Sequence, residues 1–184
     1  MTSSDVSGQA FALTVLTPIA ASEDEALRGY LENLRANGER GPLARLPRTH
    51  FGRLVIVRDF DFVSDKVPDP DHLSTPHLLF TACFDGDLDS YLDELGAELA
   101  TEAQEIWGRC AGAPSPAAGP ALKEYLKAHR IKTGFFVAAY GQATVPQVKA
   151  ALERREQLIA FAQQAQAMQT NAELKQAFLE QFGT

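Results

Sequence analysis

The chain has 184 residues, of which 45% are hydrophobic and 22% are charged, and its net charge is −7 at neutral pH. Such a composition is typical of a globular protein rather than a disordered one, and the acidic balance argues against a nucleic-acid partner, because phosphate binding needs a basic surface. The apolar run at 11–21 follows no basic segment and is far shorter than the ~20 residues that span a membrane. We therefore expect a single cytoplasmic domain over residues 1–184 without membrane contact.

Alternation and helical spacing predict most elements of the first half of the chain. Residues 1–9 are small and polar, so we expect a frayed terminus. The β-prone run at 11–19 predicts a first strand, and leucine and tyrosine at helical spacing predict a helix between Ser22 and Asn37-Gly38. A second strand follows at 49–60, and then three prolines and four aspartates at 61–76 predict a long exposed connection.

The second half begins with a buried strand at 77–84, a tight Asp85-Gly86 turn and a helix from about Asp87. That helix carries an apolar stripe that extends to Ile106. A loop rich in alanine, glycine and proline at 111–120 separates it from the following elements. These are a short helix at 121–130, a fourth strand at 134–140, a long helix from Thr144 to about Gln166 and a last helix after Asn171.

This order predicts an α+β fold of the ferredoxin-like βαββαβ kind, an antiparallel sheet with helices on one face and additional C-terminal helices. We expect a core over about 11–141 and a helical extension over about 144–184. The strands are apolar on both faces, although a face that meets water should be polar. A second copy, the C-terminal helices or an apolar ligand must therefore cover the second face. Because monomers rarely expose large apolar patches, we favour a homodimer with a cavity for a hydrophobic small molecule; residues 171–184 either dock on the partner or pack on their own chain.

Several motifs resemble a group of uncharacterised bacterial proteins in which a His-Phe-Ala-Arg strand precedes a Leu-Leu-Phe…Asp-Gly…Tyr-Leu unit. The matching residues, within about 11–160, are His50-Phe-Gly-Arg53, Leu78-Leu-Phe80, Phe84-Asp-Gly86, Tyr91-Leu92, Cys110–Pro114 and Leu122–Arg130. The architecture is also similar to the dimeric α+β barrel superfamily, which includes haem peroxidases and cofactor-free monooxygenases. The chain lacks the Gly-x-x-Asp-Gly motif of dye-decolorising peroxidases, since Ala82 stands where its first glycine would be.

His50, Arg53 and Asp85 are the candidate catalytic residues. Antiparallel pairing of the second and third strands places His50 near Asp85, which would orient the imidazole and raise its pKa. His50 and Arg53 share a face only if Gly52 marks a β-bulge. The alternative for His50 is a histidine at a strand end that bonds to the backbone.

His77, Cys83 and Tyr140 are the candidate ligand-binding residues. No metal site is predicted: His50 and His77 fall at opposite ends of their hairpin, and the aspartates at 85–89 match helix capping better than a calcium loop. Cys83 and Cys110 form no disulfide or metal pattern.

No stretch carries a motif specific to one reaction. The sequence favours a small-molecule-binding or auxiliary protein with an apolar cavity at the sheet face. The alternative is an oxidoreductase of the α+β barrel kind, haem-dependent or cofactor-free. In that alternative His50 would act as acid, base or haem contact, Arg53 would hold an anion, and the axial ligand would be His50, His77 or His129.

Overall fold

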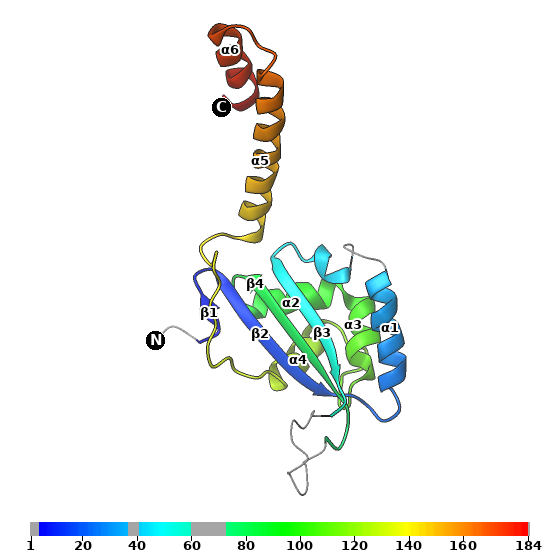
Figure 1. The fold of residues 1–184 in the computed structure, drawn as a ribbon. Helices are drawn as coiled ribbons and strands as arrows, with labels where there is room; N and C mark the ends of the chain where they lie inside the picture. Colours follow the sequence, from blue (N-terminus) through cyan, green and yellow to red (C-terminus); the bar gives the residue numbers. More distant parts are fainter. Residues whose placement is uncertain (1–3, 37–40, 60–72, 184) are drawn as a thin grey trace, which may run out of the picture. The chain divides into compact units, whose positions relative to one another are not determined.

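The computed structural model describes residues 4–36, 41–59 and 73–183. It divides the chain into a core unit, Met1–Val145, and a C-terminal unit, Pro146–Thr184. The core unit has an α+β fold (Figure 1). Within the described ranges, no helix combines the length and the apolarity needed to cross a membrane.

The elements follow the chain in an order close to the predicted one. They are β1 (Val6–Ser7), β2 (Ala10–Pro18), α1 (Asp24–Ala36), η2 (Pro42–Arg45), β3 (Thr49–Val57), β4 (His77–Asp85), α2 (Leu88–Glu98), α3 (Ala100–Ile106), η3 (Trp107–Arg109), α4 (Gly119–Ala128), α5 (Val145–Ala165) and α6 (Asn171–Phe182). The connection predicted between the second and third strands falls largely at 60–72, outside the described residues.

The four strands form one antiparallel sheet in the order β1-β2-β4-β3. β2 and β3 are joined through α1 and do not pair with each other. β4 lies between them and pairs with both. The register pairs Val15 with Phe80 and Leu54 with Phe80, so these three side chains lie on one face.

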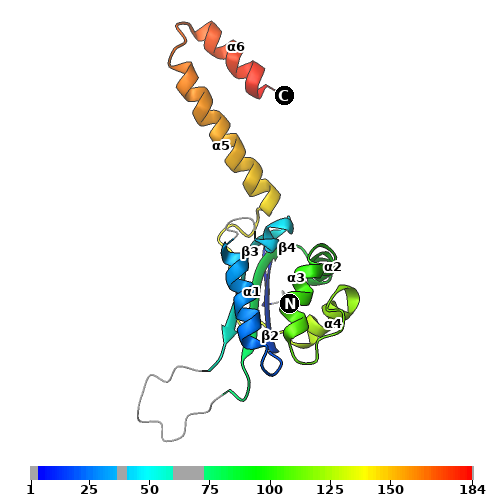
Figure 2. The ribbon, with the colours of Figure 1, turned by 90° about the vertical axis from the view of Figure 1, so that its right-hand side faces the viewer.

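The helices of the core unit cover that face. α2, α3 and α4 stand behind the sheet in Figure 1 and on one side of it in Figure 2. α1 runs beside β3, where Leu31 lies near Leu54 and Ile56. The buried side chains of β4 are anchored by aromatic contacts: Phe84 stacks on Tyr91 with 3.7 Å between ring centroids, and Phe80 meets Trp107 edge-on.

The opposite face of the sheet, which we call the bare face, carries no helix of the core unit in the parts of the chain that the structure describes. It remains apolar: Phe51 is 59% exposed and Val55 is 36% exposed, while Leu16 and Leu79 are half-buried. The predicted apolarity of both faces is therefore present in the core unit, and its described helices cover only one of them.

The predicted fourth strand at 134–140 is wrong, because these residues have no regular secondary structure. Just before this segment, the backbone pairs with β2 around Arg130, which bridges Val15, and Ile131 donates its backbone N–H to Thr14. Beyond that point the edge of β2 pairs with β1, whose residues Val6 and Ser7 form a hairpin with it. A hairpin closes a much shorter loop than a strand more than a hundred residues away, so its entropic cost is lower. The frayed terminus predicted for 1–9 is wrong for residues 4–9, because Val6 and Ser7 pair with β2; residues 1–3 lie outside the described residues.

The C-terminal unit consists of α5 and α6, which pack on each other through an aromatic cluster. Phe161 meets Phe178 and Phe182 edge-on at 5.7 and 5.5 Å. α6 begins with a complete capping box, in which Thr170 and Glu173 bond to each other's backbone N–H. α6 therefore packs on α5 of its own chain, and docking of this segment on a partner stays a prediction.

Candidate functional site

A β-bulge places His50 at the end of the bare face. Thr49 pairs with Phe84 and Phe51 pairs with Cys83, so His50 is an extra residue in β3 with no partner of its own in β4. Such a bulge re-aims the side chain at the extra position. Gly52, the position considered for a bulge, pairs regularly with Ala82, and the bulge lies at His50 instead.

The bulge brings the imidazole of His50 to the carboxylate of Asp85. Nε2 of His50 lies 2.8 Å from Oδ1 of Asp85, which confirms the predicted contact. The second oxygen, Oδ2, accepts the backbone N–H of Val145 at 2.7 Å. Asp85 is buried, and a buried carboxylate is stable only when its oxygens are hydrogen-bonded. Asp85 therefore fixes both the ring of His50 and the first residue of α5.

The neighbouring acid, Asp87, has a different role. Its side chain accepts the backbone N–H of Ser90 at 2.9 Å and caps α2. This bond lowers the pKa of Asp87, because it favours the ionised form. Of the two acids that sequence reasoning considered for capping, Asp87 caps the helix and Asp85 holds His50.

Beside His50, the structure has a pocket of about 320 Å³, which we call the His50 pocket. Its walls come from the start of β2, the bulge of β3, the end of β4 and the segment predicted as a fourth strand. The lining residues are Ala10, His50, Phe51, Cys83, Phe136, Val137, Ala138, Ala139 and Tyr140. The walls are mainly aromatic and aliphatic, and His50 supplies an imidazole that Asp85 orients.

The segment 134–141, which we call the arm, is held in place by contacts with the N-terminal hairpin. Ser7 Oγ accepts the backbone N–H of Ala138 at 3.1 Å, and Gln9 donates its backbone N–H to Gly141. Gly8 and Gly141 approach so closely that a Cβ on either would collide with a backbone carbonyl of the other segment. Gly8 also has a φ of +64°, which glycine adopts without strain.

Asp5 and Arg130 fix the beginning of the arm. They form a partly buried ion pair, and the other carboxylate oxygen of Asp5 accepts the backbone N–H of Thr133 at 2.8 Å. The guanidinium of Arg130 also lies over the ring of Phe11, 5.2 Å from its centroid. These contacts explain how a segment without regular structure forms a defined wall.

Cys83 is the buried thiol of the pocket. Burial raises the pKa of Cys83, and the negative charge of Asp85 raises it further. The group is therefore a protonated thiol at neutral pH, and it is a poor nucleophile because the thiolate is the reactive form. Cys83 and Cys110 are both free and buried, which agrees with the predicted absence of a disulfide.

The structure separates the other predicted residues from the pocket. Arg53 pairs across from Thr81 on the bare face, the same face as His50, but it is exposed and does not line the His50 pocket. His77 lies at the far end of β4, opposite Val57 and Pro18, and its Nδ1 donates to the carbonyl of Thr75 at 2.8 Å. Of the predicted site residues, His50, Cys83 and Tyr140 line the pocket and Asp85 orients one of them.

His50 does not fit the axial ligand of a haem. Haem iron needs an axial side chain that projects freely toward it, but Nε2 of His50 is engaged by Asp85. The remaining nitrogen, Nδ1, sits next to the attachment of the ring to its Cβ, where a macrocycle would meet the backbone. His129, whose Nδ1 donates to the carbonyl of Tyr125, does not line the His50 pocket, and within the described ranges no group of three or more potential metal ligands exists.

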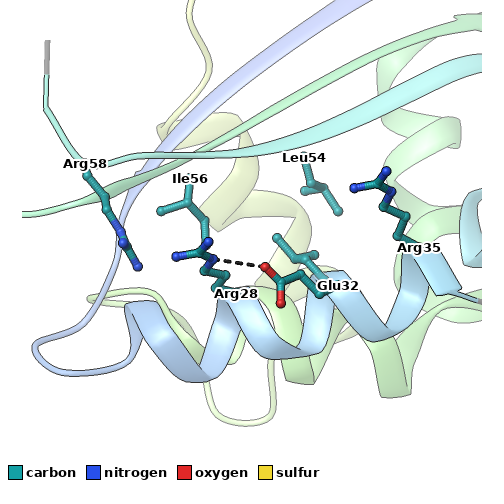
Figure 3. A pocket seen from close by; sticks show the side chains of 7 residues that line it. Arg28, Glu32, Arg35, Leu54, Ile56 and Arg58 are labelled. Atoms are coloured by element: carbon teal, nitrogen blue, oxygen red, sulfur yellow. Dashed lines mark hydrogen bonds and ion pairs between the residues drawn. The ribbon is translucent and has the colours of Figure 1, made fainter. Parts of the chain in front are cut away.

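A second concave surface, the α1–β3 groove, has a volume of about 460 Å³ (Figure 3). Leu31, Leu54 and Ile56 line it, and Arg28, Arg35 and Arg58 surround them. Two of these arginines are already paired: Arg28 with Glu32 at 3.0 Å, and Arg58 with acids at the start of α1. The groove is therefore a weaker candidate for an anion than its arginines suggest.

The sequence indicated Tyr140 but not the hairpin residues or the rest of the arm as parts of the site. The available signal was the Ser7-Gly8 dipeptide, which marks a turn before the β-prone run of β2. Gly134 and Gly141, the two ends of the arm, were a second signal of irregular structure. Val145 was unpredictable, because a backbone N–H carries no sequence signature.

Comparison of the chain with protein-family models, with curated proteins and with solved structures finds no match.

Proposed function

We propose that this protein binds a small, largely apolar molecule in the His50 pocket. The observation that carries the proposal is an apolar pocket of about 320 Å³ whose one imidazole is fixed by a buried carboxylate. Ligand sites are typically concave and apolar, with volumes of roughly 300–1,000 Å³ and a few well-placed polar groups. The His50 pocket has this combination of properties.

The fold supports the proposal, because the His50 pocket lies at the end of the bare face. We interpret the core unit as a variant of the ferredoxin-like fold in which the N-terminal hairpin replaces the last strand. The order β2, β4, β3 and the position of α1 between β2 and β3 favour this interpretation. The resemblance to the bacterial group and to the dimeric α+β barrel superfamily remains part of the proposal.

We also propose a homodimer in which a second copy covers the bare face. Phe51 and Val55 are exposed there, and the arm adds Phe135, Val137 and Tyr140, which are 84%, 68% and 82% exposed. Apolar surface of this extent favours association, and a twofold dimer buries the same patch on both copies. The His50 pocket would then lie at the margin of the interface.

Binding is tested with N-phenylnaphthylamine, a neutral dye that fluoresces in apolar sites. We expect one dye to bind each chain. Replacing Ala139 with tryptophan fills the pocket from an exposed position and should weaken binding at least about tenfold. Ala97→Trp, an exposed position on α2, is the matched control and should leave affinity unchanged. Equal loss in both variants, or none in either, contradicts the proposal.

The dimer is tested by light scattering after gel filtration. We expect a mass of twice the 20.0 kDa of one chain. Val55→Asp introduces a charge on the bare face, on the edge strand β3, and two such charges within a shared apolar interface would repel, so this variant should be monomeric. Ala97→Asp should remain dimeric. A wild-type protein that is monomeric at tens of micromolar refutes the dimer without affecting the binding proposal.

A further inference from the structure

The first observation is the state of the His50 ring. Because Asp85 accepts at Nε2, the neutral ring carries its proton on Nε2 and a lone pair on Nδ1. Within the residues that the structure describes, Nδ1 has no hydrogen-bond partner, and the ring lines the pocket. In its neutral form, His50 therefore presents a hydrogen-bond acceptor to a molecule in the pocket.

The second observation is that the other side chains of the pocket offer few hydrogen-bonding groups. Cys83 holds its proton, because burial and Asp85 raise its pKa, and a thiol is a weak hydrogen-bonding group. Tyr140 is 82% exposed, so water satisfies its hydroxyl without a ligand. The other lining side chains are alanine, valine and phenylalanine. Among the lining side chains, His50 thus offers the one strong hydrogen bond to a bound molecule.

The third observation is the sign of the local charge. No arginine or lysine lines the pocket, and the carboxylate of Asp85 lies directly behind His50. Arg48, near the main chain of Asp85, pairs with Glu94 at 2.9 Å. Beside a neutral His50, an anionic ligand would enter an apolar space next to a buried negative charge, and no arginine or lysine of the lining would balance it.

We infer that the His50 pocket selects neutral, flat aromatic molecules that carry one hydroxyl or N–H donor, which bonds to Nδ1 of His50. This inference rests on the proposed binding function and adds the chemical class of the ligand. The aromatic walls of Phe51, Phe136 and Tyr140 accommodate a planar ring. Phenolic and indolic compounds belong to this class; aromatic carboxylates do not.

The test is a competition series near neutral pH in which three probes of equal ring size displace N-phenylnaphthylamine from the full chain. Naphthol has a donor, naphthalene has none, and naphthoate is an anion. We expect naphthol to bind at least about tenfold more tightly than either of the others. In His50→Phe, which keeps an aromatic wall but lacks Nδ1, naphthol and naphthalene should differ less than about twofold. His129→Phe, outside the pocket, should keep the wild-type preference.

The outcomes separate the two proposals. If naphthol and naphthalene bind the wild-type protein equally, or if naphthoate binds best, the inference is overturned while the binding function stands. If neither the dye nor any naphthalene binds, the proposed function fails and the inference fails with it. The wild-type series decides these cases even if His50→Phe does not fold.

Discussion

Replacing Asp85 with alanine should lower the free energy of unfolding by about 3 kcal/mol. The change leaves the backbone N–H of Val145 and the Nε2–H of His50 without their acceptors, and both groups are at least partly buried. Each unsatisfied buried donor costs about 1–3 kcal/mol. Urea unfolding followed by the fluorescence of Trp107 measures the effect.

Two further variants show whether the carboxylate acts as described. Asp85→Asn keeps an oxygen for Val145 but offers His50 a poorer partner, so its loss should be about half as large. Asp93→Ala removes an exposed acid that pairs with Lys123, and such a surface pair contributes about 0–1 kcal/mol. If Asp85→Ala unfolds like the Asp93 variant, Asp85 does not organise the site.

The protein should lose stability steeply between pH 10 and pH 12, and Tyr91 should cause much of the loss. Burial raises the pKa of Tyr91 from its ordinary value of 10.0 to about 12. Above pH 10 the unfolded chain gives up this proton and the folded chain keeps it, so the folded state binds more protons and its stability falls as pH rises. A shift of this size corresponds to about 3 kcal/mol by pH 12.

Tyr91→Phe tests this origin. The variant loses the hydrogen bond to Thr49, 3.0 Å long, so at neutral pH it should be less stable by about 1 kcal/mol. At pH 12 the order should reverse, because phenylalanine has no proton to lose. Tyr140→Phe, at an exposed position, serves as the control and should follow the wild-type curve. Parallel curves for the wild type and Tyr91→Phe across this range contradict the assignment.

Local patterns predicted the central elements well. β2, β3 and β4 follow runs of β-prone residues, and α2 follows an apolar stripe that needs only local spacing. The contact between His50 and Asp85 also followed from the sequence, because antiparallel pairing of neighbouring strands brings the start of one beside the end of the other. These features depend on a few residues that are close in the chain or directly paired.

The arm and the hairpin could not be predicted in this way. The stretch from Phe135 to Tyr140 has the composition of a strand, but its place beside β2 is taken by Val6 and Ser7. Two segments compete for pairing with the same edge of β2. The residue pattern of either segment alone does not predict which of them pairs. The bulge at His50 is equally invisible, since it changes register without changing composition.

The central claim is that the His50 pocket holds an apolar ligand, and amide NMR spectra of isotope-labelled protein titrated with N-phenylnaphthylamine test it most directly. We expect saturable chemical-shift changes confined to Phe51, Cys83 and residues 136–140. Their concentration dependence should give the same affinity as the fluorescence titration, and the changes should be absent in the Ala139→Trp variant. Shifts concentrated at Leu31, Leu54 and Ile56, in the α1–β3 groove, would contradict the claim, as would weak changes spread over the whole core unit.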